Sequence, residues 1–140
     1  MYKTILVTLD STPTDRAIIE HIKQLAKFMQ GRVILLHVAD GWAARTFGPD
    51  AVSPEITEDK AYLNQIQSEF QSAGVSVEAQ LAFGEPSKEI IKCIEQKGCD
   101  LVAMSTHGHG PVKDLILGSV ADSLRHQIDI PILMIRAVNK

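Results

Sequence analysis

Four short, uninterrupted apolar runs constrain the fold of this 140-residue chain more than any other feature of its sequence. Strands that are buried on both faces have this composition, and such strands are typical of parallel sheets covered by helices on both sides. The runs are Ile5-Leu6-Val7, Val33-Ile34-Leu35-Leu36, Leu101-Val102-Ala103-Met104 and Ile132-Leu133-Met134-Ile135.

The segments between these runs carry apolar residues at helical spacings of three and four. Gly31, Gly74 and Gly98 fall where the helices are expected to end. The segment from Val75 to Leu81 alternates between apolar and polar residues, which predicts a strand near a sheet edge. Strands and helices therefore alternate along one domain, residues 1–140, and predict a wound α/β fold with a five-stranded parallel sheet and helices on both faces. The helical positions are Ala17, Ile18, Ile22, Leu25, Ala26 and Met29, then Leu63, Ile66 and Phe70, then Ile90, Ile91 and Ile94.

Composition and charge exclude several classes of protein. Hydrophobic residues make up 45% of the chain and charged residues 22%, which is ordinary for a globular domain and not for a disordered chain or a coiled coil. The formal net charge is −3 and the basic residues are scattered, so no cationic face is expected to bind nucleic acid or an anionic membrane. No segment resembles a secretory signal or a membrane span.

The two cysteines, Cys93 and Cys99, lack the spacing of a redox pair or a zinc site. We expect reduced thiols in the core, and hence a cytoplasmic protein. The segment from Asp40 to Glu55 is longer than most connections in such folds and contains Trp42 and Phe47. It is either a lid over a ligand or simply mobile, and the sequence does not decide between the two.

In a wound sheet, ligands bind at the carboxyl ends of the strands where the strand order reverses. Asp10 ends the first strand, and a glycine- and histidine-rich segment begins at Ser105 after the fourth. Gly118 and Ser119 then open the last helix, with Asp122 three residues after Ser119 as in a capping box. A helix start of this kind offers free N–H groups and the positive end of the dipole to a phosphate. Taken alone, these residues are better explained by a turn at Gly110-Pro111 followed by an ordinary helix start at Gly118-Ser119.

The spacing of these residues resembles a known signature. Ser105-Thr106-His107-Gly108, nine further residues and Gly118-Ser119 closely follow G-x-x-G-x9-G-[ST], the nucleotide-binding signature of the universal stress protein family. The resemblance extends over essentially the whole chain and includes KTILVTLD, LLHV, DLVAMSTHGHG, LILGSVADSLRH and IPILMIR. It implies a Rossmann-like sheet with strand order 3-2-1-4-5, adenine-nucleotide binding (ATP or AMP) and a role in stress responses.

The resemblance also assigns roles residue by residue. Asp10, in the segment Thr8-Leu9-Asp10, matches the acid directed at the ribose, Val38 the residue whose backbone meets the adenine edge, and Met104 the floor of the base. Two positions depart from the family pattern: Ser105 replaces the first glycine, and Thr8 replaces a proline. The phosphate-binding positions are Gly108, Gly118, Ser119 and Val120.

His107 and His109 form an H-x-H pair that could hold a transition metal only with a third ligand, and none lies at a convincing spacing. Alternatively, His107 orders the loop and His109 faces solvent or phosphate. A Mg²⁺ ion is expected, if at all, through the nucleotide phosphates, because Mg²⁺ seldom needs a dedicated protein cage.

The chain lacks a P-loop, a G-x-G-x-x-G fingerprint and a nucleophile elbow, so no catalytic residue is assigned and any ATP hydrolysis is expected to be slow. Three hypotheses remain. The first is a binding module whose nucleotide occupancy changes the surface shown to unknown protein partners. The second is a weak ATPase or a nucleotidyl or phosphoryl transferase using the same pocket. The third is a structural dimer in which Ser105 has ended nucleotide binding.

The last strand predicts the assembly. In the order 3-2-1-4-5 it lies at a sheet edge, yet its residues are apolar, and soluble proteins usually cover or blunt such an edge. The family resemblance implies an antiparallel pairing of two copies about a twofold axis. We therefore expect a homodimer, the alternative being a monomer whose edge is covered by residues 137–140. The predicted contact residues are Ile132, Leu133, Met134, Ile135 and Arg136.

Overall fold

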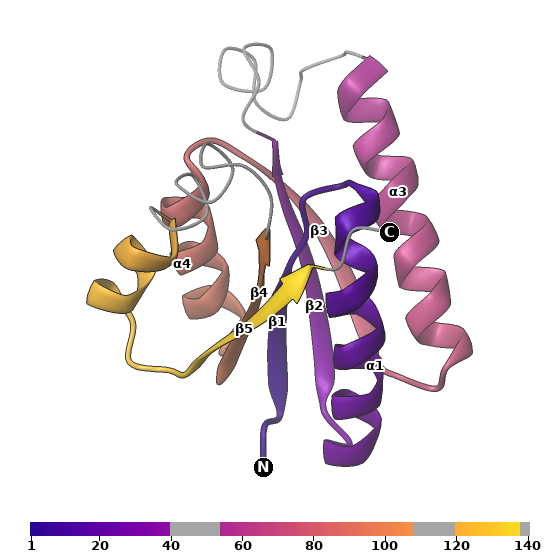
Figure 1. The fold of residues 1–140 in the computed structure, drawn as a ribbon, viewed down its shortest axis with the longest axis horizontal. Coiled ribbons are helices and arrows are strands. Elements are labelled where there is room, and N and C mark those ends of the chain that lie inside the picture. Colours follow the sequence, from indigo (N-terminus) through magenta and orange to yellow (C-terminus); the bar gives the residue numbers. More distant parts are fainter. Residues whose placement is uncertain (40–53, 108–119, 138–140) are drawn as a thin grey trace.

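A computed structural model describes residues 1–39, 54–107 and 120–137 of the chain. Its centre is a five-stranded sheet in the order β3-β2-β1-β4-β5, in which every neighbouring pair is parallel (Figure 1). The predicted fold class and strand order are therefore confirmed. The strands are β1 (Thr4–Thr8), β2 (Arg32–Ala39), β3 (Val77–Phe83), β4 (Leu101–His107) and β5 (Ile132–Ala137). The helices are the 3₁₀ turn η1 (Pro13–Asp15), α1 (Arg16–Met29), α3 (Pro54–Ser72), α4 (Pro86–Lys97) and the helix over residues 120–127.

Helices cover both faces of the sheet and divide the core into two clusters. α1 and α3 lie on one face, and α4 and the helix over 120–127 lie on the other (Figure 1). Side chains alternate between the two faces along each strand, so Ile5 and Val7 of β1 join the first cluster and Leu6 joins the second. All three side chains are fully buried, as expected for a central strand with helices on both sides.

The two edge strands differ from the central strands in burial. On β3, predicted as an edge strand from its alternating pattern, most residues are half-buried, and Glu78 forms an ion pair with Lys97 of α4 at 3.0 Å. On β5, Leu133 and Ile135 pack against the first cluster, whereas Met134 points outward with 41% of its surface exposed.

One predicted helix end was misplaced by a residue. The sequence suggested that Gly31 ends the first helix, but α1 ends at Met29 and Gln30 adopts the left-handed conformation of the cap, with φ of 55°. Gly31 is needed for a different reason: a Cβ at this position would lie 2.7 Å from the backbone oxygen of Tyr2. Gly98, by contrast, takes the left-handed cap position of α4 as predicted.

Both cysteines are free and buried, in agreement with the prediction of core thiols. Burial raises the pKa of Cys99 to about 12, which keeps this thiol protonated and unreactive at neutral pH. None of the helices in the described ranges is both long and apolar enough to span a membrane.

Candidate functional site

A pocket opens at the carboxyl ends of β1, β2 and β4. The chain reverses its strand order here, because β1 has β2 on one side and β4 on the other. The pocket has a volume of about 160 Å³ and lies on the sheet face covered by α4 and the helix over 120–127. Its walls are predominantly apolar, and the sequence motifs did not single out four of its residues. These four are Leu36, His37, Pro86 and Ile90.

Half of the twelve predicted site residues meet in this pocket. β1 and the turn after it supply three residues, and β2, β4 and the helix over 120–127 supply one each. Gly108, His109, Gly118 and Ser119, and the side chain of His107, lie outside the described residues. Their predicted roles are therefore untested. The six residues brought together are Thr8, Leu9, Asp10, Val38, Met104 and Val120.

Ser105 lies beside the pocket but not in its wall. Ala103 and Ser105 are on the same face of β4, because side chains alternate along a strand, and Ala103 packs into the α1 cluster. Met104, between them, packs into the opposite cluster and lines the pocket. Ser105 is 3% exposed, and its Oγ has no hydrogen-bond partner within the part of the chain that the structure describes.

The turn after β1 is organised by Asp15, a residue that the sequence motifs did not identify. Its buried carboxylate accepts backbone hydrogen bonds from Asp10 at 2.9 and 3.1 Å, from Ser11 at 2.9 Å and from Thr12 at 3.4 Å. The hydroxyl of Tyr62 on α3 donates a further bond at 2.8 Å. The form T-x-x-D, from Thr12 to Asp15, was an available signal, since it resembles a capping box with Asp as the acid.

The pKa of Asp15 reflects two opposing influences. Burial raises it above the ordinary value and is the largest cause, while the bonds from the Asp10 amide and from the Tyr62 hydroxyl act to lower it. The pKa of Tyr62 is also raised, first by burial and then by the charge of Asp15. Tyr62 therefore remains a protonated donor toward the carboxylate.

His37 makes a second polar connection at the same edge. Its Nδ1 lies 2.7 Å from the carbonyl oxygen of Leu9, which can only accept, so the Nδ1–H donates. Its Nε2 lies 3.3 Å from Oδ2 of the buried Asp59 on α3. The end of β2 and the turn after β1 are thus both tied to α3.

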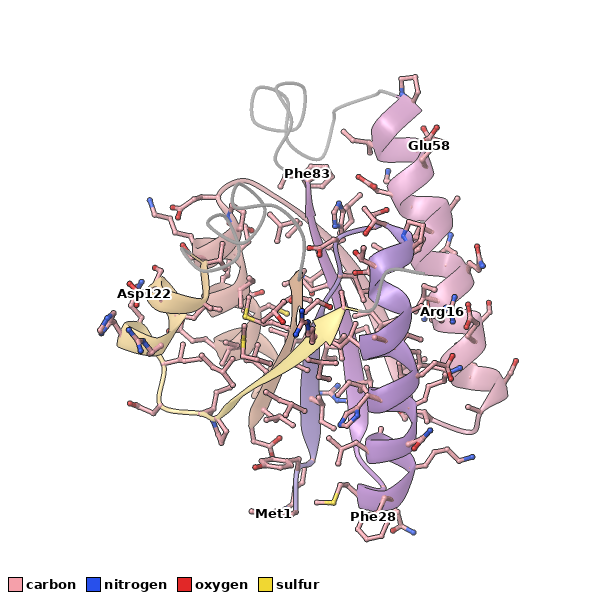
Figure 2. The ribbon with its side chains drawn as sticks, viewed as in Figure 1. Met1, Arg16, Phe28, Glu58, Phe83 and Asp122 are labelled. Carbon is pink, nitrogen blue, oxygen red and sulfur yellow. The ribbon has the colours of Figure 1, made fainter. Side chains whose placement is uncertain are left out.

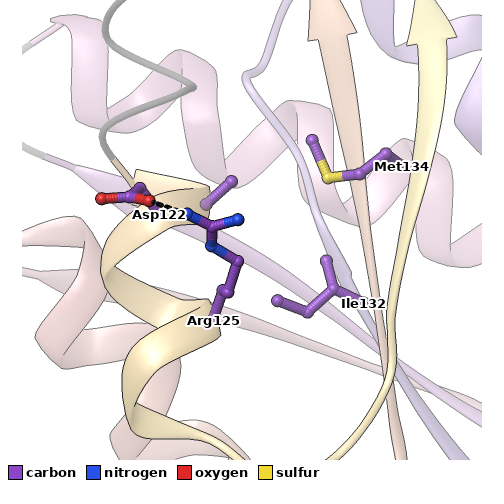
Figure 3. A pocket seen from close by; sticks show the side chains of 5 residues that line it. Asp122, Arg125, Ile132 and Met134 are labelled. Carbon is purple, nitrogen blue, oxygen red and sulfur yellow. Dashed lines mark hydrogen bonds and ion pairs between the residues drawn. The ribbon is translucent and has the colours of Figure 1, made fainter.

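A second hollow, called here the β5 hollow, lies between the helix over 120–127 and strand β5. It is lined by Ala121, Asp122, Arg125, Ile132 and Met134, and its volume is about 420 Å³ (Figure 3). Arg125 donates to Asp122 at 2.6 Å across its rim. The hollow therefore combines an apolar floor on β5 with one ion pair on the helix.

Two features lie away from the pocket. Met1 and Phe28, exposed by 90% and 84%, are at the opposite end of the sheet from Phe83, which marks the carboxyl edge (Figure 2). Within residues 1–39, 54–107 and 120–137, no three His, Cys, Asp or Glu side chains gather in a way that could hold a metal ion.

Comparison with known proteins identifies the family. The sequence model of the universal stress protein family matches residues 1–136. The chain belongs to the universal stress protein family. It is 28% identical over 158 residues to the universal stress protein MJ0577 of Methanocaldococcus jannaschii, with 99% of this chain and 98% of that protein aligned. The solved structure of MJ0577 matches it with a TM-score of 0.81 at 29% identity, covering 100% of this chain and 99% of that one.

Other universal stress proteins share the fold at lower identity. One from Archaeoglobus fulgidus, solved in complex with dAMP, matches with a TM-score of 0.70 at 18% identity, covering 96% of this chain and 98% of that one. Another, solved in complex with cAMP, matches with a TM-score of 0.72 at 18% identity, covering 96% and 97% of the two chains. At these identities the likeness concerns the fold.

Proposed function

We propose that this universal stress protein is an adenine-nucleotide-binding module, with ATP or AMP as its ligand. The observation that carries the proposal is the pocket at the point of strand reversal, where apolar walls and the Asp10 segment meet. Fold relatives solved in complex with dAMP and cAMP support an adenine nucleotide as the ligand class.

The size of the pocket suits one part of a nucleotide. A volume of about 160 Å³ is below the roughly 300–1,000 Å³ of pockets that enclose a whole ligand, so the described residues enclose the base. Met104, Ile90 and Val120 offer apolar surfaces to a planar ring, and the backbone of Val38 offers hydrogen bonds to its edge. Asp10 then accepts from the ribose hydroxyls.

The phosphates extend toward Gly108, Gly118 and Ser119, whose placement in this proposal comes from the sequence signature. Ser105, His107 and His109 belong to the same side of the site. A bound Mg²⁺ is held by the phosphates and water. The protein works as a regulatory module in the cytoplasm, where free thiols such as Cys93 and Cys99 remain reduced.

Ligand identification is the first test. Mass spectrometry of freshly purified protein is expected to release an adenine nucleotide, and titration calorimetry is expected to detect AMP or ATP binding. Val120→Trp fills the base pocket and Gly118→Val obstructs the phosphates, so each is expected to weaken binding at least tenfold, about 1.4 kcal/mol. Gln127→Trp, exposed at the C-terminal end of the helix over residues 120–127, is the matched control.

The same preparation separates the alternatives. Phosphate release from ATP with added Mg²⁺, abolished by Gly118→Val, would make the protein a slow ATPase or transferase. Neither released ligand nor calorimetric binding would leave the structural dimer without nucleotide and overturn the proposal. Unchanged affinity in a folded Val120→Trp variant would move the base to another part of the surface.

We also propose a homodimer through β5, the edge strand made of Ile132, Leu133, Met134, Ile135 and Arg136. Leu133 and Ile135 pack inward, so Met134 and the β5 hollow form the outward apolar surface. Met134→Lys is expected to shift the light-scattering mass from dimer toward monomer, because it places a charge on the contact. Phe28→Lys, which replaces an apolar residue that is 84% exposed at the other end of the sheet, should leave the mass unchanged. A wild-type protein that is monomeric at high micromolar concentration would exclude the dimer.

A further inference from the structure

Asp15 is a buried acid at the carboxyl edge that accepts hydrogen bonds from several donors. It is 0% exposed, and its two oxygens accept from three consecutive backbone amides and from the Tyr62 hydroxyl. Amides that converge in this way need an acceptor at the centre, because a buried N–H without a partner is costly. The carboxylate therefore determines the course of the turn from Asp10 to Thr12.

This turn is also one that the backbone does not favour by itself. Ser11 adopts a left-handed conformation with φ of 64°, which costs a residue with a Cβ about 1–2 kcal/mol. The bond from the Ser11 amide to Asp15 holds it there. Because the amide of Asp10 is bound to both oxygens of Asp15, the direction of the Asp10 side chain at the pocket wall depends on Asp15.

The acceptor is itself held from α3. Tyr62 fixes the carboxylate of Asp15, and Asp59, three residues earlier on α3, pairs with His37. His37 in turn donates to the carbonyl of Leu9, directly before Asp10. The backbone on both sides of Asp10 is therefore connected to α3.

We propose that Asp15 is a positioning residue of the nucleotide site: it holds the backbone of the turn so that the Asp10 carboxylate faces the ribose. This inference rests on the proposed nucleotide-binding function. In this role Asp15 does not contact the ligand. The affinity of the site for the ribose nevertheless depends on Asp15, a buried acid outside the pocket wall.

The test is a double-mutant cycle read by titration calorimetry with AMP and adenosine. Asp15→Asn replaces one acceptor oxygen by a donor that opposes the backbone amides, and it is expected to raise the Kd of both ligands about tenfold. In the background of Asp10→Ala, the same substitution is expected to change the Kd less than twofold, because its effect passes through Asp10. Fully additive effects would show that Asp15 acts on affinity independently of Asp10 and would overturn the proposal.

Glu69→Gln is the matched control, since it removes an acid from the same α1–α3 contact, bonded to Arg16 at 2.6 Å, that does not touch the turn. It is expected to leave the Kd of AMP unchanged. If wild-type protein fails to bind AMP and adenosine, the proposed function fails before the cycle begins. Binding by the wild type with an unaffected Asp15→Asn variant contradicts only the role of Asp15.

A milder variant covers the case in which Asp15→Asn does not fold. Tyr62→Phe removes one of the donors to the carboxylate and keeps the aromatic ring in place. It is expected to raise the Kd of AMP about threefold in the presence of Asp10 and not in its absence, which again reflects coupling between neighbouring groups. An unchanged Kd in folded Tyr62→Phe would overturn the proposal.

Discussion

The ends of β1 and β2 make polar contacts on one face of the sheet and line an apolar pocket on the other. Toward α1 and α3 they are closed by polar contacts, in which Asp15 and His37 bind the turn after β1 to α3. Toward α4 they form the apolar wall of an open pocket of about 160 Å³. The difference indicates a division of labour, in which the bonded face fixes the backbone that the open face presents to a ligand.

Strand geometry explains how one segment builds both faces. Successive side chains point to opposite sides, so the imidazole of His37 pairs with Asp59 of α3 while Leu36 and Val38 pack into the cluster under α4. A side-chain change on one face therefore reaches the other through the shared backbone.

The largest contrast is expected between two isoleucines on opposite faces. Ile66 of α3 is fully buried in the core cluster under α1 and α3, and Ile90 of α4 is buried but borders the pocket. Ile66→Ala is expected to lower the free energy of unfolding by about 4 kcal/mol, and Ile90→Ala by about 2 kcal/mol, because the cavity left by Ile90 opens to the pocket. Urea denaturation measures both. Equal losses would mean that the pocket wall is as tightly packed as the core under α1 and α3.

Asp10→Ala tests the part of the open face that the bonded face positions. A charge-assisted hydrogen bond to a hydroxyl contributes roughly 1.5–3 kcal/mol, so the Kd of AMP and adenosine is expected to rise tenfold or more. Calorimetry with pyrophosphate is the control, since this ligand lacks the ribose and its affinity should hardly change. Parallel losses for nucleoside and pyrophosphate would place Asp10 near the phosphates instead.

The central strands and half of the predicted site residues could be predicted from the sequence, for different reasons. The apolar runs at Ile5-Leu6-Val7 and Leu101-Val102-Ala103-Met104 predicted the central strands because two-sided burial leaves little choice of residue. The pocket residues Asp10, Val38 and Met104 were predicted because the family resemblance assigns roles to these positions at strand ends. Local patterns of this kind carry most of the fold and half of the candidate site.

The bonded face was missed because only the fold brings Tyr62 and His37 to the turn that Asp15 organises. Asp15 and Tyr62 are 47 positions apart, and His37 was quoted only as part of a strand end. A buried carboxylate becomes recognisable only when its donors have been brought together by the fold. The end of the first helix was misplaced by one residue, because Gln30 takes the left-handed cap conformation and Gly31 is instead required by its close approach to Tyr2.

Ser11→Gly is expected to stabilise the bonded face without altering its contacts. Relief of the left-handed strain is partly offset by the greater freedom of glycine in the unfolded chain, which leaves a net gain of about 0.5 kcal/mol. Urea denaturation is the measurement. Ser76→Gly is the control, because among the described residues only Ser11 and Gln30 are non-glycine residues with positive φ, and it should lower stability by a similar amount. A loss in both variants would show that the Ser11 side chain itself is needed.

The smallest expected effect is the pH dependence of stability that Asp15 contributes. It tests whether burial or hydrogen bonding has the stronger influence on the pKa of Asp15. Burial raises the pKa of Asp15 in the folded protein above the ordinary value of 3.8, and the Asp10 amide and Tyr62 hydroxyl oppose this rise. Between the unfolded and folded pKa values the native state then binds more protons than the unfolded state, so the contribution of Asp15 to stability is complete below pH 3.8 and is lost as the pH rises through the folded pKa.

Urea denaturation of wild type and Asp15→Asn from pH 4 to 7 isolates this contribution, because the other acids cancel in the difference. The advantage of wild type over Asp15→Asn is therefore expected to shrink with rising pH. An advantage that grows with pH would show that the four donors outweigh burial, and would make the bonded face most stable when Asp15 is charged.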